Sequence, residues 1–167
     1  VTLRCGEEHR TLPVEEFFID YGKQDRRDGD FVESLHIPFL ADQDRFAAYK
    51  ISKRMDEDIS AVAIAFRMRE RSGVVEDIKI ACGGLAATPK RAKNVERLIV
   101  GKTWTEEIVT KAVSGFDEDF TPLSDWRASA GYRSLVAKNL LRRFFLETTQ
   151  SSENIRLVRE TSAGVHA

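Results

Sequence analysis

Three consecutive acids form the densest group of chemically active side chains in the sequence. Asp56, Glu57 and Asp58 lie between two apolar runs, and the basic residues Lys53 and Arg54 precede them. Carboxylate oxygens can bind a hard cation, but consecutive residues in a turn rarely direct their oxygens at one point. A solvated hairpin turn is the simpler interpretation of this charged block when it is considered alone.

The other candidate residues do not form an arrangement typical of catalysis. Gly83 and Gly84 could cradle a phosphate, but no dinucleotide-binding or Walker spacing surrounds them. A tight exit from a buried strand is the preferred interpretation of this pair. Cys82 ends an apolar run and is expected to be a small buried hydrophobic residue rather than a nucleophile. Residue chemistry alone therefore indicates a domain without an active site of its own.

The composition is typical of a globular protein and excludes several classes of partner. Of the 167 residues, 42% are hydrophobic and 32% are charged, and the net charge of -1 gives no signature of nucleic-acid binding. No apolar run approaches the roughly 18 residues of a membrane span, and the first residues lack the pattern of a signal peptide. Cys5 and Cys82 are far apart, and three scattered histidines offer no metal cluster. We expect a cytoplasmic chain and, because residue 1 is not Met, a piece of a longer one.

Alternating apolar and polar residues predict strands in the first half of the chain. The predicted strands cover residues 1–5, 9–12, 31–38, 46–54, 59–71 and 74–82. A proline start followed by two acids predicts a helical turn over residues 13–18, whereas the charged residues 22–30 are expected to form a loop. The alanine content of residues 59–71 also allows a helix, but alternation favours a strand that continues through a turn as a long hairpin.

The second half of the chain predicts helices. The first would have Thr88 as its N-cap and Pro89 at its first position, and Gly101 would close it. A capping-box spacing that begins at Thr103 precedes a second apolar helical face, which extends to Phe116.

An acidic loop is predicted over residues 117–126, followed by a long final helix over residues 128–147 and a polar tail. Strands therefore precede helices along the chain. This order predicts an α+β fold in which an antiparallel sheet of about three to four strands is followed by a three-helix layer.

Three segments together resemble the flavin-binding part of xanthine dehydrogenases. Residues 49–62 (YKISKRMDEDISAV) are similar to the signature of its second subdomain, and residues 81–92 (ACGGLAATPKRA) to the glycine turn before its first helix. Residues 125–133 (DWRASAGYR) are similar to the segment that opens its last long helix. The segments occur in the family's order and at its spacing. Residues 1–38 also resemble the end of the main flavin-binding subdomain.

The resemblance implies the C-terminal part of the iron–sulfur and FAD subunit of a bacterial xanthine dehydrogenase, in the CO dehydrogenase flavoprotein C-terminal class. Relatives such as CO dehydrogenase usually have a Gly-Asp pair at the acidic turn, where this chain has DEDISAV. The implied organisation has three parts. Residues 1–40 would end the main FAD-binding subdomain, residues 41–150 would form the C-terminal-like domain, and residues 151–167 would form a polar tail.

The same resemblance implies cofactors and partners. The family's small subunit carries FAD and two 2Fe–2S clusters and pairs with a large subunit that binds molybdopterin. The complex hydroxylates xanthine and hypoxanthine and passes electrons through the clusters and FAD to NAD. This sequence has neither the cluster-binding cysteines nor the glycine-rich loop that holds the FAD diphosphate. We therefore expect a chain that shares FAD with an upstream FAD and iron–sulfur part and is not catalytic alone.

The resemblance also implies which residues face the cofactor. The family places a residue matching Val32 against FAD and a lysine matching Lys50 beside it. The loop that matches Arg54, Glu57 and Asp58 lies near the isoalloxazine ring on the NAD side. A lysine at the pyrimidine edge of the flavin would favour its anionic reduced form, and acids on the loop would oppose this effect.

Two alternatives stay open. The chain could be a non-catalytic interaction module built on the same fold, because no self-contained active site is evident in the sequence. It could also belong to a related molybdenum enzyme that acts on an aldehyde, CO or an aromatic thioester, because the molybdenum subunit selects the substrate.

Overall fold

The computed structural model describes residues 1–149, which form two parts with separate hydrophobic cores. The N-terminal part contains β1 (Thr2–Cys5), β2 (Glu8–Thr11), α1 (Val14–Phe17), β3 (Phe18–Asp20), β4 (Lys23–Gln24) and β5 (Phe31–Ser34). β1 lies between β2 and β5 in an antiparallel sheet, and β3 pairs with β4. The small core of this part consists of Leu3, Leu12 and Phe17.

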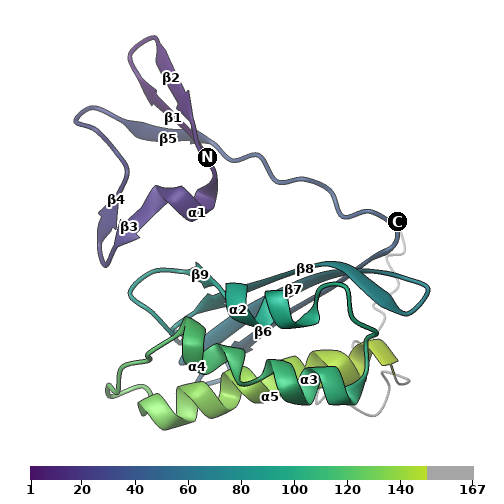
Figure 1. Ribbon diagram of the computed structural model, residues 1–167. Helices are drawn as coiled ribbons and strands as arrows, with labels where there is room; N and C mark the ends of the chain where they lie inside the picture. The colour runs from purple at the N-terminus through teal and green to yellow at the C-terminus, as the bar shows by residue number, and fades with distance from the viewer. Residues whose placement is uncertain (150–167) are drawn as a thin grey trace, which may run out of the picture.

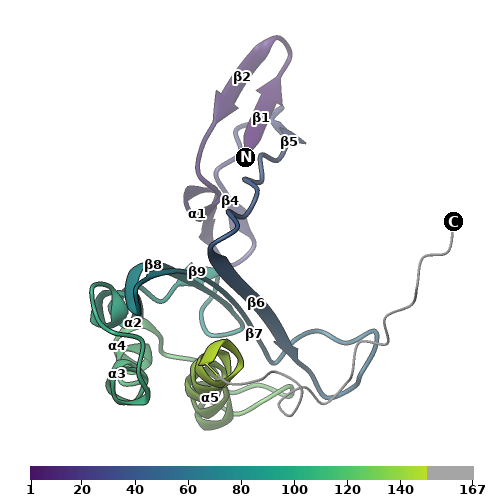
Figure 2. The same ribbon diagram turned by 90° about the vertical axis from the view of Figure 1, so that its right-hand side faces the viewer.

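The C-terminal part is one antiparallel sheet with helices on one of its faces. It contains β6 (Asp44–Ile51), β7 (Val62–Arg71), β8 (Val74–Gly83), β9 (Lys90–Arg91), α2 (Lys93–Ile99), α3 (Glu106–Ala112), α4 (Gly115–Asp119) and α5 (Ala130–Thr149). The strand order is β6-β7-β8-β9, and each neighbouring pair is antiparallel. Figures 1 and 2 show the four helices on one side of this sheet and the N-terminal part on the other side.

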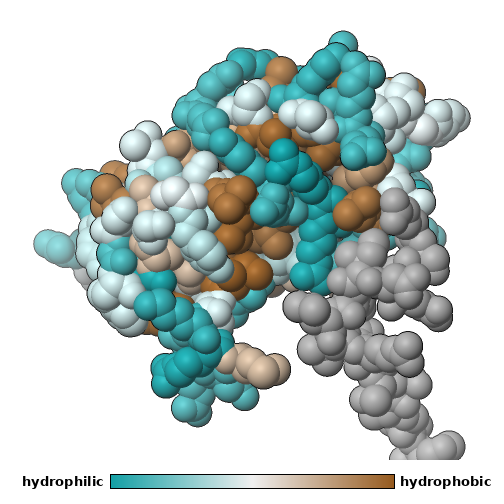
Figure 3. All heavy atoms as spheres, turned by 90° about the horizontal axis from the view of Figure 1, so that it is seen from below, coloured by the Kyte–Doolittle hydropathy of each residue, from teal (hydrophilic) through white to brown (hydrophobic). Residues whose placement is uncertain are grey.

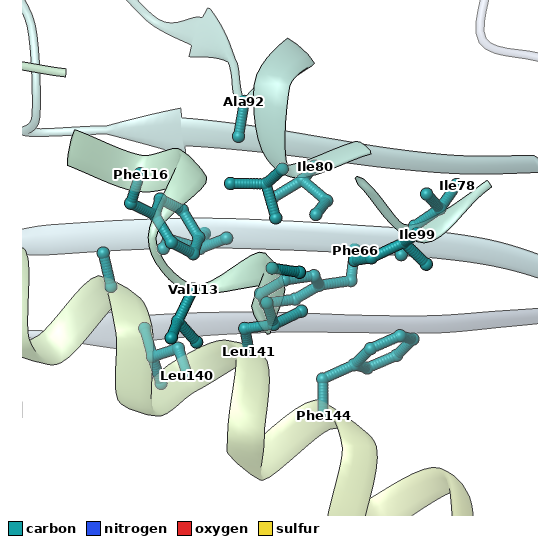
Figure 4. Packing of buried hydrophobic residues seen from close by; sticks show 14 of the residues in the cluster. Phe66, Ile78, Ile80, Ala92, Ile99, Val113, Phe116, Leu140, Leu141 and Phe144 are labelled. Atoms are coloured by element: carbon teal, nitrogen blue, oxygen red, sulfur yellow. The ribbon is translucent and has the colours of Figure 1, made fainter. Parts of the chain in front are cut away.

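The main core lies between the sheet and the helices. Large apolar residues alternate along β7 and β8 and point toward the helices, as expected of a sheet with one covered face. The rings of Phe66 on β7 and Phe144 on α5 stack with their centroids 4.9 Å apart, among side chains from β8 and α2 (Figure 4). Cys82 is part of this core, as predicted, and its burial raises the pKa of its thiol.

The predicted α+β fold is confirmed, including the long hairpin of β7 and β8, but several strand predictions need correction. The strand expected over residues 46–54 is β6, which ends at Ile51, and the strand expected over residues 59–71 is β7, which begins at Val62, so a loop lies between them. β5 ends at Ser34, whereas a strand was expected over residues 31–38. Residues 35–40 instead form an extended connection toward β6 and carry exposed apolar side chains, including Phe39. The predicted loop over residues 22–30 contains β4, which forms because Lys23 and Gln24 pair with β3.

The first long helix does not begin at Pro89, as the N-cap pattern predicted. Lys90 and Arg91 pair with β8 as the short edge strand β9, and α2 begins only at Lys93. The side chain of Asp119 caps α2 from a distant part of the sequence, since its Oδ2 accepts the backbone N–H of Asn94 at 2.9 Å. Tertiary contacts therefore set the start of this helix.

The predicted second helix is divided into α3 and α4, which makes four helices rather than three. α3 has Thr105 as its N-cap, not Thr103, and the Thr105 hydroxyl accepts the N–H of Ile108 at 3.4 Å. α4 begins at Gly115, where a Cβ would lie 2.9 Å from the backbone nitrogen of Val95. The close approach of α4 to α2 thus requires glycine.

The final helix extends beyond its predicted end at residue 147. Thr148 belongs to α5, and its hydroxyl accepts a hydrogen bond from the Trp104 indole nitrogen at 2.9 Å. This contact joins the end of α5 to the start of α3. The polar tail predicted over residues 151–167 lies outside the described residues.

The helix side of the molecule presents a mixed surface. Seen from below, it combines hydrophilic and hydrophobic residues (Figure 3). Tyr132 and Leu135 on α5 are among the exposed apolar residues of the chain. Within residues 1–149, none of the helices combines the length and the apolar character that crossing a membrane requires.

Replacing Phe144 with Ala is expected to destabilise the C-terminal part strongly. The substitution removes a fully buried ring that stacks on Phe66, and such losses cost about 3–5 kcal/mol of unfolding free energy. Urea unfolding measures the change. The control is Phe39→Ala, which removes the same side chain where it is fully exposed and should cost less than about 0.5 kcal/mol. Equal losses in the two variants would contradict the assigned core.

Asp44 joins the start of β6 to two arginines of β7. Its Oδ1 accepts hydrogen bonds from Arg67 Nη1 at 3.1 Å and from Arg69 Nε at 3.0 Å, and its Oδ2 accepts the Ala41 N–H at 3.1 Å. These hydrogen bonds lower the pKa of Asp44 to about 2, and the hydrogen bond from Arg69 has the largest effect.

The Asp44→Asn substitution is expected to remove a pH-dependent stabilisation. A carboxyl group whose pKa is lower in the folded than in the unfolded state stabilises the fold above the unfolded pKa, and loses this effect as pH falls through the folded pKa. The difference in unfolding free energy between wild type and Asp44→Asn should therefore be largest above about pH 5 and should shrink toward about pH 2. Urea unfolding across this range measures it. A difference that stays constant with pH would contradict the ionic role of Asp44.

Candidate functional site

The face of the four-stranded sheet that the helices leave open has a half made of small residues. The register aligns Ala48, Ala65 and Ala81 in one row across β6, β7 and β8. The next row consists of Lys50, Ala63 and Gly83. These rows line a shallow, mainly apolar hollow of about 380 Å³, which Pro89 also borders. We call the alanine and glycine residues of these two rows the small-residue half, and Lys50 borders it.

The other half of the open face carries paired charges. The next rows place Phe46 beside Arg67 and Lys79, and Asp44 beside Arg69 and Asp77. Arg67 contacts the carboxylates of both Asp44 and Asp77, and Arg69 contacts Asp44, so the two arginines of these rows are paired with the two aspartates. The open face therefore changes within a few residues from ion pairs to a flat apolar surface.

Lys50 is an exposed cation at the edge of the small-residue half. It precedes the end of β6 by one residue, and the loop of residues 52–61 begins immediately afterwards. The backbone N–H of Ala61 donates to the Ile51 carbonyl at 2.8 Å and closes the base of this loop. Lys50 and the loop thus share one edge of the sheet.

The loop is organised by Asp58. Its carboxylate accepts the backbone N–H of Arg54 at 2.9 Å, and this hydrogen bond is the main reason why the pKa of Asp58 is lowered. The Arg54 guanidinium donates to the Glu57 carbonyl at 2.7 Å, and Glu57 has a left-handed backbone with φ of 49°. The carboxylate of Asp58 therefore stabilises the loop through a hydrogen bond within it, whereas the side chains of Arg54 and Glu57 are exposed.

The structure places four of the five candidate residues at one edge of the C-terminal sheet. Lys50 ends the small-residue half, and Arg54, Glu57 and Asp58 belong to the adjacent loop. Val32 is exposed on β5, in the separate N-terminal sheet, where it pairs with Leu3. That part lies on the open side of the C-terminal sheet (Figure 1).

A contact between the two parts lies near β9. The Arg91 guanidinium donates to Glu15 at 2.7 Å and also binds Glu96 at 2.6 Å. These hydrogen bonds raise the pKa of Arg91, and the hydrogen bond to Glu96 has the largest effect. Arg91 therefore links α1 of the N-terminal part to α2 behind the sheet.

Sequence reasoning did not find the small residues of the open face or the role of Arg133. The alternation of Ala63 and Ala65 with large apolar residues was visible, but which face stays open depends on where the helices pack. Arg133 belongs to the third sequence segment singled out above, and the structure places its side chain in the interior, beside Asp125. Its contacts connect segments that are far apart in the sequence.

Residues 47–148 match a known family, the CO dehydrogenase flavoprotein C-terminal domain. The chain is 28% identical over 171 residues to xanthine dehydrogenase 2 of Arabidopsis thaliana. This alignment covers 98% of this chain and 12% of that protein. It is 33% identical over 152 residues to a nicotinate hydroxylase of Emericella nidulans, with coverage of 87% and 11%. A glyceraldehyde dehydrogenase medium chain of Sulfolobus acidocaldarius is 29% identical over 147 residues, with coverage of 88% and 52%.

A solved structure shows the same fold. The carbon monoxide dehydrogenase of Hydrogenophaga pseudoflava superposes with a TM-score of 0.80 at 26% sequence identity, over 85% of this chain and 49% of that chain. The chain thus spans about half the length of the glyceraldehyde dehydrogenase medium chain and of this solved chain. It spans a much smaller share of the xanthine dehydrogenase and of the nicotinate hydroxylase. The resemblance found in the sequence is confirmed, because the family match covers more than half of the chain. The chain belongs to the CO dehydrogenase flavoprotein C-terminal domain family, the C-terminal flavoprotein domain of molybdenum hydroxylases.

Proposed function

We propose that the open face of the sheet forms one side of the FAD site in a molybdenum hydroxylase. FAD is the cofactor of this flavoprotein part and supplies the hydride and electron chemistry. The supporting observation is the small-residue half beside Lys50, where Ala and Gly side chains leave a flat apolar surface. A planar three-ring system can lie against such a surface, because no large side chain projects from it.

Each candidate residue has a distinct part in this proposal. Lys50 would supply a positive charge beside the flavin ring, where it would favour negative charge on the cofactor. Val32, which is exposed on β5, would contact FAD from the N-terminal part. Glu57 and Arg54 are exposed on the loop and would face NAD as it approaches, whereas Asp58 holds the shape of the loop.

We further propose that the complete enzyme is an NAD-dependent xanthine dehydrogenase in the cytoplasm. Its partners would be the upstream FAD and iron–sulfur part of the same subunit, with two 2Fe–2S clusters, and a large subunit that binds molybdopterin. The DEDISAV loop sequence and the similarity to a plant xanthine dehydrogenase support this proposal. In this arrangement residues 1–40 end the main FAD subdomain, residues 41–150 form the C-terminal domain, and this chain is not catalytic alone.

A second candidate function has its own support. The similarities to a nicotinate hydroxylase and to a glyceraldehyde dehydrogenase medium chain favour a related enzyme that acts on another heterocycle or on an aldehyde. Assays of the complete enzyme with xanthine, nicotinate and glyceraldehyde would distinguish the candidates. A non-catalytic interaction module would instead contain no flavin in the complete protein and would oxidise none of these substrates.

Replacing Lys50 with Ala in the complete enzyme is expected to slow NAD reduction roughly tenfold, the effect of losing about 1.4 kcal/mol of electrostatic stabilisation of the transition state. Xanthine oxidation by an artificial acceptor that takes electrons upstream of the flavin should be nearly unchanged. Steady-state kinetics with each acceptor measures both rates.

The matched control is Lys79→Ala, which removes a lysine from the charged half of the same open face. It should leave both activities near those of the wild type. Equal losses of the two activities in Lys50→Ala would contradict the assignment of Lys50 to the flavin.

A further inference from the structure

Arg133 is a buried cation that joins three segments of the chain. It lies in the first turn of α5 and is 5% exposed. Its Nη1 donates to the backbone carbonyls of Ala61 and Gly84, the latter at 2.8 Å, and its Nη2 donates to Asp125 Oδ1 at 2.7 Å. The planar guanidinium suits this role, because its donors point in several fixed directions at once.

Gly84 permits this close arrangement. Its φ is +80°, and a Cβ at this position would clash with the carbonyl oxygen of Ala61 and approach Arg133 Nη1 to 3.1 Å. Only glycine therefore lets the end of β8, the end of the 52–61 loop and the first turn of α5 meet at one point.

The beginning of the loop is attached to the same region. Lys53 Nζ donates to the Trp126 carbonyl at 2.6 Å, one residue after Asp125. Asp125 Oδ1 also accepts the backbone N–H groups of Arg127 at 2.9 Å and Ala128 at 3.0 Å, which fixes the local turn. The beginning of the loop is therefore held by the segment that precedes α5, and its end is held by Arg133 in the first turn of α5.

We propose that Arg133 is a positioning residue that fixes the orientation of the 52–61 loop beside Lys50 and thereby controls how NAD reaches the flavin. Its contacts lie at the loop's end of the sheet, and it acts through Ala61 rather than by touching the cofactor. The control of NAD access rests on the proposed function, whereas the orientation of the loop does not.

The test uses two variants of the complete enzyme. Arg133→Lys keeps the positive charge, but one ammonium group cannot bind all three acceptors in the geometry of the guanidinium. Lys53→Met removes the other attachment at an exposed side chain, so that the fold should be retained. The control is Lys102→Met, an exposed lysine whose backbone carbonyl accepts the Val75 N–H at 3.0 Å at the opposite end of β8.

Hydrogen exchange of peptides that cover residues 52–61 is the primary readout, together with the melting temperature and the kinetics with NAD and with an artificial acceptor. Both variants should speed exchange in the loop roughly tenfold, the change expected when one hydrogen bond from a charged group is lost. KM for NAD should rise, while turnover with the artificial acceptor stays unchanged. The control should match the wild type.

Unchanged loop exchange in both variants would overturn the proposal. So would a uniform increase across the sheet and helices, because Arg133 would then support only the general fold. Faster exchange confined to the loop with unchanged NAD kinetics would support the role of Arg133 in positioning the loop. The same result would overturn the proposal that the loop controls how NAD reaches the flavin. The failures of the two proposals can therefore be told apart.

Discussion

The four-stranded antiparallel sheet buries one face against the helices and leaves the other uncovered, and the rest of the structure depends on this asymmetry. Large apolar residues such as Phe66 and Ile80 must all point one way, toward α2 and α5. The residues between them then form the open face. Alanine and glycine there keep the surface flat, and Lys50 supplies a charge at its edge.

Three segments of the chain meet at the edge where β6 ends. The loop after β6 is closed at its base and held internally by Asp58. Arg133 and Gly84 bring the end of β8 and the start of α5 to the same place. The three sequence segments that resemble the flavoproteins are widely separated in the chain, and the fold brings parts of all three together at this edge.

Much of the fold could be predicted from local patterns, and the remainder depended on distant contacts. Alternation identified β6, β7 and β8 and assigned the two faces of β6 correctly. The start of α2 was missed because Lys90 and Arg91 pair with β8 and because Asp119 caps the helix from elsewhere in the sequence. The assignment of Val32, Lys50, Arg54, Glu57 and Asp58 to the cofactor came from the resemblance alone. The small-residue half could not be recognised until the helices showed which face stays open.

The most direct test of the account is the FAD content of the complete enzyme that carries Ala65→Phe, measured from the flavin absorbance per protein. This substitution puts a large ring into the centre of the small-residue half. Lys79→Phe puts the same ring into the neighbouring charged half and serves as the control. We predict that Ala65→Phe loses most of its FAD while keeping its melting temperature, and that the control retains FAD. Full FAD content with an unchanged flavin spectrum in Ala65→Phe would contradict the assignment of this face to the cofactor.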